Sequence, residues 1–154
     1  MNRKLAIAVL LVALAFAGLA WFEHHRTAGR DVAARQSTAA ATAAAQAIFS
    51  YDYRSFEASV ANGRSFATGA FADEYAQTTT ALKDSAVKEQ AIVRAAVSAS
   101  GVVSATADRV EVLLYLNQYR RNANVTGEKV DQNRVVLTMV RHAGEWKVSA
   151  ATAL

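Results

Sequence analysis

The sequence predicts an α+β protein in which one membrane-spanning helix precedes a domain of helices and an antiparallel sheet. Three observations support this class. Residues 5–22 are apolar and uncharged, the first half of the remaining chain is rich in helix formers, and the second half is rich in β-branched and aromatic residues. Because the helical segments come before the strands, the two kinds of element are expected in separate layers. With 154 residues, 53% of them hydrophobic, the chain has room for one domain and is too apolar to be disordered.

Charge and cysteine content exclude several classes of function. The net charge is +4, and two of these charges, Arg3 and Lys4, precede the apolar run. The other basic residues are dispersed among acids, so no surface that follows a nucleic-acid backbone is predicted. The absence of cysteine removes disulfides, zinc thiolates and cysteine nucleophiles. We expect no cofactor, no metal and no nucleic acid.

The apolar run at residues 5–22 is long enough to cross a membrane. At about 1.5 Å per residue it extends roughly 27 Å, close to the hydrocarbon thickness of a bilayer. Trp21 and Phe22 close it, where aromatic rings favour the membrane interface. Because the short N-terminus (residues 1–4) is basic, we expect it in the cytoplasm and the rest of the chain outside, as in a single-pass membrane protein.

A cleaved signal peptide is the competing interpretation of the same run. Residues 15–17, Ala-Phe-Ala, have the small-x-small form that signal peptidase requires. The run continues past this site through Leu19 to Phe22, which favours an uncleaved anchor. The sequence leaves the question of cleavage open.

The next segments are expected to be helical. Residues 23–47 form a predicted juxtamembrane stalk, rich in alanine, whose helix has Asp31 as N-cap and continues through Ile48 and Phe49 toward Tyr53. The extracytoplasmic domain is expected to occupy residues 48–154. Within it, Asn62-Gly63 and Thr68-Gly69 separate a short helix, 54–61, from a longer one, 70–88. The longer helix carries an apolar stripe: Phe71, Tyr75, Thr78, Leu82 and Ala86.

Four antiparallel strands are predicted in the second half, over residues 91–105, 109–121, 134–142 and 145–151. The second shows the clearest alternation, with Val110, Val112, Leu114 and Leu116 on one face. Polar residues 104–108 and 122–133 are expected to be connections. Ala143-Gly144 predicts a tight hairpin turn between the last two strands.

One aspartate and three histidines are candidates for catalysis or metal binding, and each also has a simpler structural explanation. Asp52, between Tyr51 and Tyr53, resembles a carboxylate of an enzyme site, but pairing with Arg54 or capping of a helix is the favoured interpretation. His24 and His25 are interpreted as a polar flank of the membrane helix, because adjacent histidines point in different directions. His142, beside the hairpin turn, is expected to be solvent-exposed. No catalytic residue is assigned.

Large apolar side chains suggest a pocket on the inner side of the sheet. Core packing is the favoured role for most of them in a domain of this size, with an apolar ligand pocket as the alternative. The candidates are Phe56, Phe66, Phe71, Tyr75, Leu114, Tyr115 and Trp146.

Several short pieces, in their order and spacing, resemble the Mce-associated membrane proteins that accompany lipid-import systems of the mammalian-cell-entry type. The pieces are residues 50–56, with Tyr51, Asp52, Tyr53 and Arg54; residues 68–71 with Tyr75; residues 101–103; Asn117 and Gln118 after Leu116; and residues 141–149, with Gly144 and Trp146. The resemblance covers nearly the whole chain. It implies a cone-shaped domain of helices and a curved sheet, similar to nuclear transport factor 2 and to the periplasmic domain of a type IV secretion assembly factor.

The resemblance also implies a function. The expected role is a non-enzymatic accessory subunit that stabilises an Mce-type lipid or sterol importer, with transporter subunits or other envelope proteins and membrane lipid as partners, and with homo- or hetero-oligomers allowed. One alternative is a lipid-binding cone that passes apolar substrate to the transporter. A third is an isomerase-like enzyme around Asp52.

Overall fold

A computed structural model describes Trp21 and residues 29–154 of the chain. The predicted cytoplasmic segment (1–4), nearly all of the predicted membrane helix (5–22), the signal-peptidase site (15–17) and both His24 and His25 lie outside the described residues. Within the described part, no helix combines the length and apolar character needed to cross a membrane.

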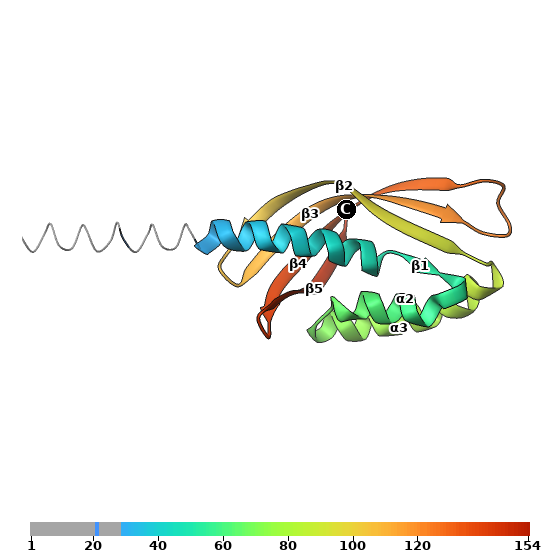
Figure 1. Cartoon of the computed structure of the whole chain (residues 1–154), viewed down its shortest axis with the longest axis horizontal. Coiled ribbons are helices and arrows are strands. Elements are labelled where there is room, and N and C mark those ends of the chain that lie inside the picture. The colour runs from blue at the N-terminus through green and yellow to red at the C-terminus, as the bar shows by residue number, and fades with distance from the viewer. Residues whose placement is uncertain (1–20, 22–28) are drawn as a thin grey trace, which may run out of the picture.

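Residues 29–48 form a helix that runs along the sheet (Figure 1). It packs there through a stripe of small side chains. The helix already includes Gly29, so Asp31 is not its N-cap, and it ends at residue 48 instead of continuing toward Tyr53. Its buried side chains are Ala33, Ser37, Ala41, Ala44, Ala45 and Ile48. Spacings of three and four place them on one face, and their small size brings the helix backbone close to the sheet. This buried stripe begins at Ala33, within the predicted stalk, and ends at Ile48. The division into stalk and domain at residue 48 stays a prediction.

The chain then forms a short strand and two helices. Strand β1 is Tyr51–Asp52, a 3-10 turn η1 covers Tyr53–Ser55, and helices α2 and α3 are Phe56–Ser65 and Gly69–Lys88. The predicted boundary at Thr68-Gly69 is confirmed, because Thr68 is the N-cap of α3. The predicted break at Asn62-Gly63 is wrong: both residues lie inside α2, where Gly63 is buried against α3.

Helix α3 buries a stripe that differs in part from the predicted one. Phe71, Tyr75 and Ala86 are buried as expected. Thr79 is buried in place of Thr78, and its hydroxyl donates to the Tyr75 carbonyl at 2.8 Å. A buried threonine within a helix can satisfy its hydroxyl on the preceding turn, which apolar periodicity does not reveal.

The sheet has the strand order β1-β2-β3-β4-β5, and every neighbouring pair is antiparallel. Its long strands are β2 (Ile92–Ala105), β3 (Arg109–Arg121), β4 (Lys129–His142) and β5 (Glu145–Ala153). The four predicted strands are present, and β1 is an addition too short for alternation to indicate it. Strand β4 begins at Lys129, not Arg134, because residues 129–133 continue the pairing with β3. The predicted turn at Ala143-Gly144 is confirmed, with φ of 50° and 86°.

The core lies between the helices and the inner face of the sheet. Fully buried side chains on β3 and β4 include Val110, Val112, Leu114, Leu137 and Met139. The opposite side of the sheet is its outer face, and Figure 1 shows α2 and α3 together on the inner side with helix 29–48. The helices and the curved five-stranded sheet confirm the predicted α+β class.

Candidate functional site

An apolar cleft of about 270 Å³ lies between the end of helix 29–48, helices α2 and α3, and the sheet. Three of the predicted pocket residues, Phe56, Phe71 and Tyr75, line it. The rings of Phe71 and Tyr75 are 6.4 Å apart, and Tyr51 meets Phe56 edge-on at 5.6 Å. Burial raises the pKa of the Tyr75 phenol, which therefore stays protonated at neutral pH.

The cleft has few polar groups. Gln118 reaches it from β3 and donates through Nε2 to the carbonyl of Phe49 at 3.4 Å, and Glu74 lies on its rim in an exposed part of α3. Ile48, Val60 and Leu82 complete the apolar lining. Of these three, only Leu82 belonged to a pattern that could have indicated its place, the stripe of α3. An apolar cleft with isolated polar groups suits a small apolar molecule or an apolar side chain.

The other predicted pocket residues lie elsewhere. Leu114 is fully buried in the core, Phe66 is half-buried against it, and Trp146 is buried on β5 with the guanidinium of Arg141 5.0 Å from its ring. Tyr115 is on the outer face and is 43% exposed. Adjacent residues of one strand point to opposite faces, so Leu114 and Tyr115 do not share a pocket.

Asp52 is occupied by its neighbour Arg54. Its Oδ1 accepts from the Arg54 backbone N–H and from Nε, both at 2.9 Å, and its Oδ2 accepts from Nε at 3.1 Å. These hydrogen bonds hold the pKa of Asp52 below its usual range. Asp52 therefore pairs with Arg54 and is also the N-cap of the 3-10 turn η1, whereas the sequence interpretation offered pairing or the cap of a helix as alternatives. A carboxylate with a lowered pKa is a poor general base at neutral pH.

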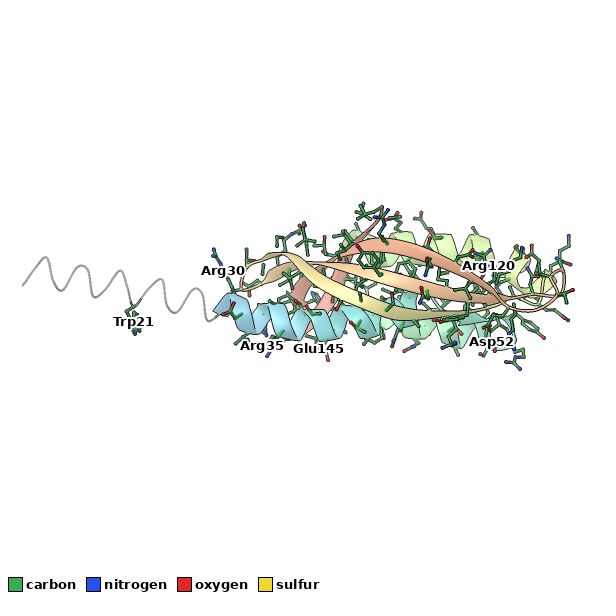
Figure 2. The ribbon with its side chains drawn as sticks, turned by 90° about the horizontal axis from the view of Figure 1, so that it is seen from above. Trp21, Arg30, Arg35, Asp52, Arg120 and Glu145 are labelled. Carbon is green, nitrogen blue, oxygen red and sulfur yellow. The ribbon has the colours of Figure 1, made fainter. Side chains whose placement is uncertain are left out.

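Asp52 also lies outside the apolar cleft, whereas Tyr51 beside it is half-buried and lines the cleft. Burial raises the pKa of Tyr51, and the nearby Arg120 partly offsets this effect. Figure 2 places Asp52 and Arg120 toward one end of the molecule and Arg30 and Arg35 toward the other. Asp52 instead lines a separate hollow of about 230 Å³ with Ser59 and Arg94, and Tyr51 lines both this hollow and the cleft.

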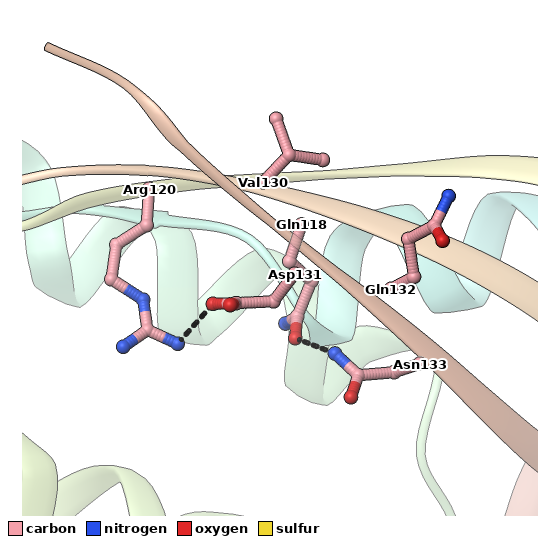
Figure 3. Close-up of a pocket in the computed structure, with 6 residues that line it drawn as sticks. All are labelled: Gln118, Arg120, Val130, Asp131, Gln132 and Asn133. Carbon is pink, nitrogen blue, oxygen red and sulfur yellow. Dashed lines mark hydrogen bonds and ion pairs between the residues drawn. The ribbon is translucent and has the colours of Figure 1, made fainter.

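A polar groove of about 740 Å³ runs along the hairpin of β3 and β4, lined by Gln118, Arg120, Val130, Asp131, Gln132 and Asn133 (Figure 3). Its polar side chains bind one another. Arg120 Nη2 donates to Asp131 Oδ2 at 2.8 Å, and Asn133 Nδ2 donates to Gln118 Oε1 at 2.7 Å. These pairs link β3 to β4 where polar residues 129–133 continue the ladder.

The remaining residues of the Mce-like motifs lie in turns or form hydrogen bonds between strands. Tyr53 begins the turn η1, Gly144 adopts the positive φ of the hairpin, and Asn117 accepts from Gln132 Nε2 at 3.4 Å. His142 is exposed at the end of β4. Among the described residues, no three His, Asp or Glu side chains come together in a way that could hold a metal ion.

No known protein family matches the sequence, and no characterised protein sequence matches it at a significant level. Solved structures do match. An IcmL-like type IV secretion system protein from Legionella pneumophila superposes with a TM-score of 0.65 at 16% identity, covering 78% of this chain and 91% of the other.

Two further structures agree with the first. The periplasmic domain of DotI superposes with a TM-score of 0.65 at 15% identity, over 76% of this chain and 91% of that one. CagV, a VirB8 homologue of the Helicobacter pylori type IV secretion system, superposes with a TM-score of 0.62 at 10% identity. The match covers 75% of this chain and 94% of CagV. The chain has the nuclear-transport-factor-2-like fold of these domains, as the resemblance implied.

The comparisons correct the functional expectation. The three structures above are secretion-system proteins, and they do not support membership of the Mce-associated family. The expected role as an accessory or lipid-passing subunit of an Mce-type importer is therefore wrong. The short motifs behind it, such as residues 141–149, are explained by the hairpin turn and by burial of Trp146, which many folds require.

Proposed function

We propose that this chain is a non-enzymatic structural subunit of an envelope-spanning assembly of the secretion or conjugation class, with its α+β domain outside the cytoplasm. The observation that carries the proposal is the extent of the fold match. The superposed structures are covered to 91–94% of their length, so this chain contains their whole domain and not a shared fragment. One of them is itself described as a periplasmic domain.

The chemistry of the described residues favours a structural role. Asp52 is paired and has a lowered pKa, and the polar side chains of the β3–β4 groove satisfy one another. The one enclosed apolar cleft among the sites described above has no convergent set of titratable groups. Sites that perform acid–base or nucleophilic chemistry bring such groups together within hydrogen-bonding distance.

The decisive experiment is a genetic one with two complementing variants. In the cells that carry this gene, its deletion is expected to abolish transfer of DNA or protein by the secretion apparatus, and the full chain restores it. Asp52→Asn is expected to restore transfer as well as the wild type does. Unimpaired transfer in the deletion strain would refute the proposal, and a requirement for Asp52 at unchanged protein level would favour an enzyme.

Membrane anchoring by residues 5–22 is part of the proposal. A chain without these residues is expected to appear in the soluble fraction and to fail in complementation. The intact mass of the protein extracted from membranes separates the anchor from a signal peptide. A mass that includes residues 1–17 supports the uncleaved anchor. A mass that lacks residues 1–17 supports cleavage after Ala17.

A further inference from the structure

The outer face of the sheet carries aromatic and basic side chains at its centre. Val110, Val112, Leu114 and Leu116 point into the core, so the alternate residues Tyr115, Asn117 and Tyr119 of β3 point outward. Their partners across the ladder are Arg134, Gln132 and Arg94, respectively, from β4 and β2. We call these six residues the Tyr-Arg face.

Both arginines of the Tyr-Arg face are available for a partner. The guanidinium of Arg94 lies 4.4 Å from the centre of the Tyr119 ring, and Arg94 and Arg134 are exposed. Within the described part of the chain, neither side chain forms an ion pair. Tyrosine and arginine are, with tryptophan, the residues enriched in the energetically important centres of protein interfaces.

Acids around the Tyr-Arg face already have partners. Glu111, toward one end of β3, accepts a hydrogen bond from Ser104 at 2.9 Å. Glu128, at the other end, pairs with Arg121 at 3.0 Å. Asp52 lines one hollow together with Arg94 and is paired with Arg54. The six residues of the Tyr-Arg face therefore carry two positive charges and no carboxylate.

A hollow lies beside Arg134 on this positively charged face. Strand β2 shifts register between Val97 and Ala99, and the displaced Ser98 donates through Oγ to the Tyr115 carbonyl at 3.2 Å. The hollow that results measures about 320 Å³ and includes Ser98, Tyr115 and Arg134 in its lining. A bulge of this kind redirects side chains and leaves backbone groups unpaired, which suits a binding surface.

From this charge and shape we infer that the Tyr-Arg face binds an extended acidic segment of another protein in the assembly. One carboxylate binds the Arg134 guanidinium above the hollow, and a second binds Arg94. Four residues along β3 and two strand spacings separate these arginines, roughly 17 Å between backbones. Acidic residues about four or six positions apart in an extended segment share one face and match this separation. The inference rests on the proposed function, because it names a partner within that assembly.

Zero-length coupling by a carbodiimide tests the contact directly. The full chain is expressed in its own cells with Arg134→Lys, which keeps the charge and adds an amine that the reagent joins only to a touching carboxylate. The control is Arg64→Lys on α2, which is exposed away from the sheet. Mass spectrometry of the products is expected to show Lys at position 134 joined to an Asp or Glu of another envelope protein, with no such product for the control.

A second pair of variants tests the charge. In an Arg94→Lys background, Arg134→Glu is expected to abolish coupling at position 94, whereas Arg109→Glu, near the far end of β3, leaves it. Coupling of position 134 to a second copy of this chain would overturn the inference of a different partner. Absence of any product while secretion subunits still copurify would overturn the inference alone, and absence of copurification would overturn it together with the proposed function.

Discussion

Gly63 of α2 lies directly against the phenol of Tyr75 on α3. A Cβ placed at Gly63 would be 2.2 Å from Tyr75 Oη, 2.9 Å from Cζ and 3.1 Å from the carbonyl oxygen of Ala47. The glycine thus permits three segments to meet: α2, α3 and the end of helix 29–48. The same three segments enclose the apolar cleft, so this contact positions its walls.

Gly63→Ala is expected to destabilise the domain by about 1–3 kcal/mol, the typical cost of overpacking, even though alanine is the better helix former. Urea denaturation measures the change in unfolding free energy. The exposed neighbour Asn62 supplies the control, and Asn62→Ala should be neutral or stabilising. Tyr75→Phe removes the nearest atom and should recover part of the loss. A stabilising Gly63→Ala would contradict the close packing.

Leu114 and Leu113 form a matched pair on adjacent positions of β3. Leu114 is fully buried and Leu113 faces outward, half-buried. Leu114→Ala is expected to cost about 2–5 kcal/mol of unfolding free energy, because it removes buried methyl groups and leaves a cavity. Leu113→Ala should cost clearly less. Equal losses in urea denaturation would show that the face assignment of β3 is wrong.

The same pair shows where sequence reasoning succeeded and where it failed. Alternation along β3 predicted the strand and its buried face, because burial of one face imposes a period of two. The pocket prediction nevertheless grouped Leu114 with Tyr115, which that period places on opposite faces. The pocket residues were chosen because their side chains are large and apolar. Which of these side chains lie in one cavity depends on the backbone geometry.

Features that depend on distant partners were not predictable from local pattern. Gly63 was interpreted as a helix break, because the sequence does not distinguish a turn glycine from a glycine buried within a helix. Its contact with Tyr75, which requires a glycine, is visible only in the folded structure. Residues 129–133 were interpreted as a connection, because their polar side chains find partners only across the hairpin. By contrast, the pairing of Asp52 with Arg54 was predictable, since the two residues are close in the chain.

Trp146 has a buried indole Nε1 without a hydrogen-bond partner in the described part of the chain. Trp146→Phe removes this unsatisfied donor while keeping an aromatic ring, so we expect a smaller loss of unfolding free energy than for Trp146→Ala, which should cost about 3–5 kcal/mol. Thermal and urea denaturation of both variants measure the difference. Equal destabilisation by the two changes would indicate that the indole nitrogen is bonded in solution.

The ion pair of Asp52 and Arg54 predicts a particular pH dependence. Because the folded-state pKa of Asp52 is lowered, its contribution to stability is present above the ordinary carboxyl pKa and is lost as the pH falls through the lowered value. The stability difference between wild type and Asp52→Asn should therefore stay constant from neutral to mildly acidic pH and shrink only in strong acid. Carboxyl NMR titration should also show the pKa of Asp52 rising in Arg54→Gln. An unchanged pKa in that variant would rule out Arg54 as the cause.

The apolar cleft remains a predicted binding pocket, and access to it can be blocked from α3. Thr78 is exposed on its rim, so Thr78→Trp places an indole over the opening, whereas Thr80→Trp adds the same ring at an exposed position outside the lining. If the cleft binds apolar molecules, a fluorescent apolar probe should bind the wild type and Thr80→Trp but lose affinity for Thr78→Trp, because burial of apolar surface drives such binding. Absence of binding by the wild type, or equal binding by both variants, would show that the cleft only packs the helices onto the sheet.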